Sequence, residues 1–431
     1  MSTRRRAGLL VAAAAAVGAA VAAALVVPGP PTRPASDAPE QVPVTSTVLG
    51  CTATPGEADV RATTADVPGS TGPGPVRTLR ARGGVVRVAG SGQDAVGLLA
   101  WRAGTQDATH CPAPRSSWWF AGAGGGLDHR TTLVLSDVDQ GAAVVDVELV
   151  GATSRVDEQA LRDLTVPPGS RRVIALADVA PSSDELTVHV TASQGRVVAQ
   201  AYDSRRSRVG GRVGHEWLPP SAPPSTDVRM PGVPADADRR TLLVTNTSDR
   251  QALVTPQVVT DDGAFVPQGH DEVSVDPGAV AVVPLDAGFD RRYAGIRLRS
   301  DVPVLGTVRS QVGDDTAYAA GGETATGFLA APTSGRSTLL LQGTDEPTGA
   351  EVSAWSAEGR RVGGAGVSVP PSGLATWSVP DDAAYVLVRP DTGRGDLVVA
   401  VVSSLPQGVA ALPLGAVPAT VARPSVRLRT E

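Results

Sequence analysis

A repeat of about 100 residues restricts this chain to a tandem array of similar modules. Each copy contains, in the same order, an apolar segment that begins with Thr, a Pro-containing turn and an apolar closing segment. The copies are Thr132–Leu135, Pro167–Ser170 and Val197–Ala199; Thr241–Val244, Asp276–Gly278 and Val304–Gly306; and Thr338–Leu341, Pro370–Gly373 and Val398–Ala400. Because order and spacing are kept, each copy is expected to fold as one module.

Apolar and polar residues alternate over short runs within each copy. In Ala143–Val150 the apolar residues alternate with Asp146 and Glu148, and Leu186–Thr191 alternates in the same way. Turns rich in Gly, Pro, Asp and Ser separate such runs, which is typical of antiparallel strands with one buried face. About seven short strands in 80–100 residues predict an immunoglobulin-like β-sandwich. A β-propeller-like fold is the alternative, since two four-stranded blades would give the same period.

A weaker copy precedes the three clear ones. Val96–Trp101 resembles a closing segment, and the sequence around Gly50 resembles an opening one. The chain is therefore expected to be all-β, with four modules in a row. Their expected bounds are 44–115, 116–207, 227–312 and 324–431, the last including a C-terminal strand, with seams near Arg115, between 207 and 227, and between 312 and 324.

The N-terminus has the pattern of an export signal. Arg4, Arg5 and Arg6 precede an uncharged run rich in Ala and Val at 9–27. About 20 apolar residues behind a positive flank predict a signal peptide or a single membrane-spanning helix at 1–27, with the rest of the chain outside the cytoplasm. Retention would anchor the protein in the membrane, whereas cleavage would release it as a secreted protein. The Pro-rich segment 28–43 is expected to be a disordered linker.

The two cysteines, Cys51 and Cys111, both lie in the expected first module. Outside the cytoplasm thiols are oxidised, so a disulfide is expected between them. It would close a loop of about 60 residues and stabilise this module by about 2–4 kcal/mol. The alternative, a nucleophile or a metal ligand, needs a nearby histidine. His110 is adjacent in sequence, but neighbours on a strand point to opposite faces.

Charge and motif patterns argue against nucleic-acid binding and against common catalytic sites. The net charge is −6, and the basic residues, all Arg, are dispersed along the chain. No Gly-x-Ser-x-Gly motif occurs, and Asp261–Asp262 and Asp314–Asp315 are interpreted as polar turns. No metal site or other cofactor is expected, because no two histidines have metal-ligand spacing. The histidines are His110, His129, His189, His215 and His270.

Trp118, Trp119 and Phe120 form the densest aromatic segment of an aromatic-poor chain. Exposed aromatic rings can stack on sugars or fill a partner's pocket. On a strand, however, Trp118 and Phe120 share one face and Trp119 takes the other, so at least one face is expected in the core. Burial is the favoured interpretation, since a buried Trp is usual in such sandwiches. Trp118 and Trp119, together with Trp217, are the candidate ligand-binding residues of the alternative.

The segment His110–Gly122 resembles the signature of an actinobacterial exported family, catalogued as domain of unknown function 5719. The resemblance continues through Leu161–Ser170 and Gly195–Ala199. It implies a secreted or membrane-anchored, mostly β protein, with no assigned activity or catalytic residues to carry over. This chain has Trp118 followed by Trp119, where the family pattern has Trp followed by Tyr.

These observations together predict a non-enzymatic protein of the cell envelope, located outside the cytoplasm. Its tandem modules would present a surface to another envelope protein or to a glycan. A carbohydrate-binding array that acts on cell-wall glycan is the alternative. A hydrolase with a site assembled from loops between modules is a third hypothesis, disfavoured because loops would have to supply every catalytic group.

Overall fold

The computed structural model describes residues 40–423, except 53–58, 81–83, 207–210, 286–288, 290, 326, 392–394 and 418. The predicted signal or anchor at 1–27, most of the predicted linker at 28–43 and the last residues of the chain lie outside this part. No helix within the described part is long and apolar enough to cross a membrane.

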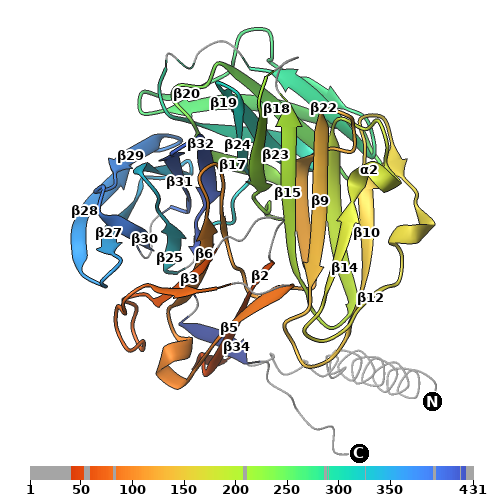
Figure 1. Ribbon diagram of the computed structural model, residues 1–431. Helices are drawn as coiled ribbons and strands as arrows, with labels where there is room; N and C mark the ends of the chain where they lie inside the picture. Colours follow the sequence, from red (N-terminus) through yellow and green to blue (C-terminus); the bar gives the residue numbers. More distant parts are fainter. Residues whose placement is uncertain are drawn as a thin grey trace, which may run out of the picture. The chain divides into compact units, whose positions relative to one another are not determined.

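Strands and short connections make up almost all of the described chain (Figure 1). The only helical elements in that part are single turns: η1 (Gly92–Ala95), η2 (Gln159–Leu161) and α2 (Leu176–Val179). At the two ends of the described chain, β1 (Glu40–Pro43) pairs with β34 (Thr420–Arg423).

The first module is the smallest. It consists of a strand pair and a four-stranded sheet, which share a core with Cys51 and Cys111. The pair is β2 (Ser46–Thr52) and β5 (Val85–Ser91). The sheet has the order β4 (Arg77–Leu79), β3 (Val60–Thr64), β6 (Leu98–Ala103) and β7 (Ala108–His110).

The second module is a sandwich of two sheets. One sheet has the order β11 (Arg155–Val156), β10 (Ala143–Val150), β14 (Leu186–Gln194) and β8 (Ser117–Ala123), with β12 (Leu164–Val166) also beside β10. The other has the order β13 (Arg171–Ala175), β9 (His129–Ser136), β15 (Val198–Arg206) and β16 (Val213–Leu218).

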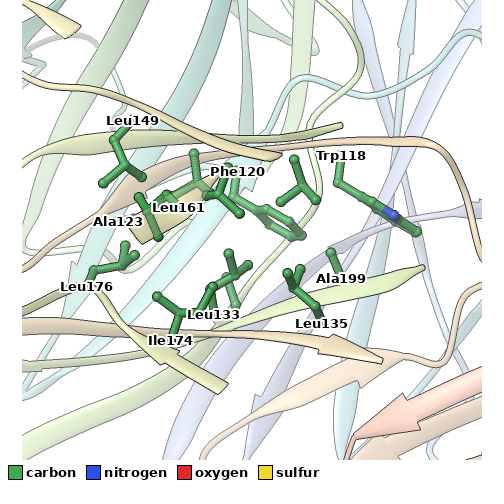
Figure 2. Packing of buried hydrophobic residues seen from close by; sticks show 14 of the residues in the cluster. Trp118, Phe120, Ala123, Leu133, Leu135, Leu149, Leu161, Ile174, Leu176 and Ala199 are labelled. Carbon is green, nitrogen blue, oxygen red and sulfur yellow. The ribbon is translucent and has the colours of Figure 1, made fainter. Parts of the chain in front are cut away.

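The core of this module lies between the two sheets, as Figure 2 shows. Phe120 and Leu149 extend from one sheet toward Leu133, Leu135 and Ile174 of the other. The alternation read from the sequence of β10 accounts for this arrangement, because its buried apolar residues alternate with more exposed polar ones.

The third module has the same order of strands, but one long strand belongs to both layers. This strand, β23 (Ala294–Val312), pairs first with β17 (Ser225–Val233) and β19 (Ala252–Thr260), and then with β18 (Arg239–Asn246) and β24 (Asp315–Ala320). The outer strands are β20 (Gly263–Phe265) and β21 (Val273–Val275) beside β19, and β22 (Ala279–Pro284) beside β18.

The fourth module repeats the two-sheet plan around its own core. One sheet has the order β28 (Arg361–Val369), β27 (Thr348–Ser356), β30 (Ala383–Pro390), β25 (Leu329–Pro332) and β33 (Gly415–Ala416). The other has the order β29 (Leu374–Ser378), β26 (Arg336–Gly343), β31 (Leu397–Leu405) and β32 (Gly408–Pro413).

The prediction of an all-β chain built from tandem β-sandwich modules is confirmed, because each of the three larger modules encloses a core of its own. The structure differs from the expected bounds at two closing strands. β16 and β24 lie in the segments 207–227 and 312–324, which were expected to be seams. Each is the last strand of its module.

Contacts between modules form a closed circuit within 43–420. The first strand of each module packs on the late strands of the next one: β2 on β15, β8 on β23, and β17 on β31 and β32. In the fourth module, Ala330 of β25 packs with Trp101 of β6 in the first. The four modules therefore pack against one another and are not independent domains joined only by linkers.

Buried polar contacts fix two of these seams. Between the second and third modules, the Tyr318 hydroxyl donates a 2.8 Å hydrogen bond to Asp203. Between the third and fourth, the Arg297 guanidinium donates to Asp227 over 2.7 and 2.9 Å and to Asp345 over 2.6 and 3.2 Å. The Arg297 side chain is only 3 % exposed, whereas those of Asp227 and Asp345 are 34 % and 57 % exposed, so the guanidinium is shielded and its partners face water in part.

Candidate functional site at the junction of four hairpins

One late strand from each of the four modules meets the others. β7 contacts β16 and β32, and β24 contacts the same two strands. Described residues of the hairpins that these strands close line a cavity of about 320 Å³. We call it the junction cavity; its walls include Gln106 from the first module, Arg212 and Gly214 from the second, Asp315 from the third, and Gln407 and Gly408 from the fourth.

Hydrogen bonds between modules hold the four hairpins together. The Gln407 amide donates to the Thr105 carbonyl over 2.9 Å, and an Arg212 guanidinium nitrogen donates to the Gln407 side chain over 3.3 Å. Gly408 allows a close approach, because a Cβ there would meet the Asp315 carboxylate and lie 2.9 Å from the Gln106 carbonyl oxygen. The cavity walls are therefore fixed by backbone as well as by side chains.

Asp315 places a buried carboxylate in the wall of the cavity. It is only 6 % exposed, and its Oδ2 accepts a 2.8 Å hydrogen bond from the Val409 amide. Its Oδ1 has no hydrogen-bond partner among the described residues. Burial raises the pKa of Asp315 to about 6, although the amides of Val409 and Thr316 act in the opposite direction. The cavity wall thus carries a buried oxygen that lacks a donor.

Two more carboxyl groups lie near Asp315. Glu216 is 4 % exposed; its Oε1 accepts a 2.8 Å hydrogen bond from the Trp217 amide, and its Oε2 has no partner in the described part of the chain. Burial, followed by the charges of Asp315 and Asp107, raises the pKa of Glu216 well above its usual value. Burial also raises the pKa of Asp107, which accepts a 3.3 Å hydrogen bond from Tyr202.

An aromatic cluster lies beside Asp107, which accepts from Tyr202. The Tyr202 ring lies parallel to the His215 ring, with centroids 5.7 Å apart, and 4.9 Å from the Trp217 ring. The Arg102 guanidinium of the first module lies 5.7 Å from the centroid of Trp217 and donates to the Thr52 carbonyl. The cluster therefore joins the first and second modules.

The junction predicts a specific dependence of stability on pH. Since the folded pKa of Asp315 exceeds its unfolded value, this residue contributes stability that is present below about pH 4 and is lost as the pH rises through about 6. Asp315→Asn is expected to raise the free energy of unfolding at pH 7.5 by about 1–2 kcal/mol and to change it little at pH 4. Urea unfolding at both pH values measures this. A loss of stability at pH 7.5 would contradict it.

The structure places the sequence-predicted aromatic residues away from the junction, except for Trp217. Trp118 is 2 % exposed, packs in the core of the second module (Figure 2) and donates a 2.9 Å hydrogen bond from Nε1 to the Val197 carbonyl. Its burial corrects the assignment of Trp118 as a ligand-binding residue. Trp119 is half-buried, and its ring stacks on His189 with centroids 3.6 Å apart. Trp217, at 2 % exposure, is also buried.

The predicted disulfide between Cys51 and Cys111 is present, with the two Cα atoms 4.7 Å apart. Both residues lie in the core of the first module. The ring of His110 points elsewhere, because its Nε2 contacts the Pro413 carbonyl of the fourth module over 3.0 Å.

The interpretation of Asp314–Asp315 as a polar turn is wrong for Asp315, which the fourth module covers through Val409. Asp261 and Asp262 do form an exposed polar turn, where both contact Arg292. Within the described ranges, no group of three or more His, Cys, Asp or Glu side chains could hold a metal ion.

A second arrangement of chemically interesting groups lies on the outer face of the second module. Ser117 Oγ lies 3.2 Å from His189 Nε2, and His189 Nδ1 lies 3.6 Å from Glu148 Oε2, in the order of a Ser–His–acid triad. The second distance is too long for a hydrogen bond, and the Glu148 side chain is 57 % exposed. Water therefore weakens the contact that would orient a catalytic histidine.

Comparisons with known proteins bear on the family and not on an activity. None of the curated proteins matches the chain. A crystal structure of chicken CNTN1 FN1-FN3 domains is similar at 12 % identity over 70 % of this chain and 100 % of that one, but its TM-score of 0.11 supports no argument. A model of a family of unknown function, DUF5719, matches residues 103–380, a range that includes Gln106, Arg212 and Asp315 of the junction cavity. The chain belongs to this family, DUF5719.

Proposed function

We propose that this chain is a non-enzymatic protein of the cell envelope, located outside the cytoplasm, that binds another envelope protein through the junction cavity and the hairpins around it. The observation that carries the proposal is the convergence of one hairpin from each of four modules on a cavity with a buried carboxylate oxygen that has no partner among the described residues. Loops held by a rigid scaffold are where binding surfaces concentrate.

The proposed location rests on two features. The disulfide favours an oxidising compartment. The N-terminal sequence, with three arginines before an apolar run, favours export and a membrane anchor. A protein held at the outer surface of the membrane would present its modules to other envelope components.

Rigidity favours binding over catalysis by domain closure. The seams between modules contain Asp203 and Arg297, which are 2 % and 3 % exposed, and separating the modules would break their hydrogen bonds. The long contact between His189 and Glu148 also favours a structural role for the exposed Ser117 arrangement. The burial of Trp118 and Trp217 makes a carbohydrate-binding array the weaker alternative.

Site-specific photo-cross-linking in intact cells tests the proposal. A photoreactive amino acid at Gln407, on the wall of the cavity, is expected to capture one reproducible envelope protein. The matched control is Val282, which is 46 % exposed on β22, a strand separated from β24 by β18 and β23. Equal capture at both positions, or only glycan at Gln407, would contradict the proposal. So would labelling of Ser117 by a fluorophosphonate probe, because that reagent marks an activated serine.

A further inference from the structure

We infer that the junction cavity binds the primary ammonium group of a small organic molecule, with the carboxylate of Asp315 as its anchor. This inference deepens the proposed binding role and rests on it. It assigns a ligand chemistry to a cavity whose walls come from all four modules.

The two carboxylate oxygens of Asp315 differ in their hydrogen bonding. Oδ2 already accepts from the Val409 amide, whereas Oδ1 is buried and has no donor in the described part of the chain. A buried carboxylate oxygen without a donor is costly, so the site favours a ligand that brings an N–H group. An ammonium group supplies three such donors together with a compensating charge.

The charges around the cavity favour a cation at its inner end. Asp107 acts on Asp315 as a like charge, both of them act in the same way on Glu216, and Glu216 Oε2 also lacks a partner within the described residues. Of the nearby cations, Arg102 is engaged with Trp217 and the Thr52 carbonyl. Arg212 is exposed beside Gln407, and its charge lowers the pKa of Asp315 but does not outweigh burial. An ammonium group next to Asp315 would offset this repulsion between carboxylates.

The size and donor set of the cavity fit an organic cation better than a metal ion. A volume of about 320 Å³ is within the range of small-molecule sites. Divalent metal ions need several ligands at short distances, and the described residues provide no group of three that could hold one. The side chains of Gln106 and Gln407 line the same cavity and can bond to neutral parts of the ligand.

Isothermal titration calorimetry of the full chain in detergent tests the inference. The probe is 1,4-diaminobutane at pH 7.5, and its uncharged analogue 1,4-butanediol is the control ligand. Saturable binding of the diamine is expected, with at least a tenfold weaker affinity for Asp315→Asn and for Glu216→Gln. Asp381→Asn, a change at an exposed acid of the fourth module, is expected to bind as the wild type does. Affinity is also expected to fall as the pH is lowered through about 6, where Asp315 becomes protonated.

Three results would overturn the inference: no saturable binding of the diamine, equal binding of the diol, or unchanged affinity in both Asp315→Asn and Glu216→Gln. The folding of each variant is checked by its unfolding transition, and Glu216→Gln keeps the test valid if Asp315→Asn alone is misfolded. If the wild-type protein captures the envelope protein at Gln407 but does not bind the diamine, the ligand chemistry is wrong and the proposed function stands. If the wild type binds the diamine but captures no envelope protein at Gln407, the proposed function is wrong and the ligand chemistry stands.

Discussion

Asp203→Ala is expected to lower the free energy of unfolding by about 3–5 kcal/mol, since it removes the central acceptor of a buried network. Asp203 accepts hydrogen bonds from Thr131 over 2.6 Å and from Tyr318 over 2.8 Å, and its Oδ1 lies 3.1 Å from His129 Nε2. Thr131 and His129 are each 2 % exposed and Tyr318 is fully buried, so water cannot replace the lost acceptor.

The same network joins two modules, which is the reason for the large expected effect. Asp203 and His129 belong to the second module, whereas Tyr318 comes from β24 of the third and inserts its ring into the core of the second. Burial tends to raise the pKa of Asp203, but His129, Thr131 and Tyr318 together hold it below its usual value. This carboxylate therefore contributes stability above its unfolded pKa that is lost at lower pH, opposite in sign to the contribution of Asp315.

Chemical denaturation at pH 7.5 measures the free energy of unfolding of Asp203→Ala, and two further variants provide values for comparison. Tyr318→Phe removes one hydrogen bond and keeps the ring, so a cost of about 1–2 kcal/mol is expected. Asp157→Ala breaks an ion pair with Arg162 in which both side chains are more than half exposed, and a cost below about 1 kcal/mol is expected. If Asp203→Ala costs no more than Asp157→Ala, the network does not hold the seam.

The sequence predicted the modules from the repeat and from strands with one face in a core and one face toward water. The alternation in β10 is such a case. The closing strand β24 escaped prediction for the opposite reason. All six residues of β24 are buried, since one face packs on its own module and Tyr318 packs on the preceding one. A strand covered on both faces has no alternation to detect.

The junction cavity could not be predicted from local patterns. Gln106, Arg212, Asp315 and Gln407 lie about 100 residues apart, and each reads in the sequence as an ordinary turn residue. The burial of Asp315 comes from Val409 in another module, so its neighbouring residues carry no sign of it. The repeat carries the one sequence signal for this site. Each of Arg212, Asp315 and Gln407 follows the closing segment of its own copy, so the three residues occupy similar positions in the repeat.

Replacing both cysteines with Ala is expected to destabilise the first module by about 4 kcal/mol, the value for a closed loop of about 60 residues in the chain-entropy model. The disulfide joins β2 to the segment directly after β7, so it links the strand pair of this module to its four-stranded sheet. The core that they share is small, and Cys51 and Cys111 are themselves among its buried residues. Little apolar burial would remain to replace the cross-link.

The loss is expected to stay mostly within the first module, because the other modules have larger cores of their own. Hydrogen exchange measured by mass spectrometry should therefore show faster exchange in β3 and β6 and unchanged exchange in β18 and β23. The fourth module should respond where it contacts the first, near Tyr385, whose ring lies 6.5 Å from that of Trp101, and near Gln407 and Pro413, which contact Thr105 and His110. A uniform increase over all four modules would mean that the closed circuit of contacts unfolds as a single unit.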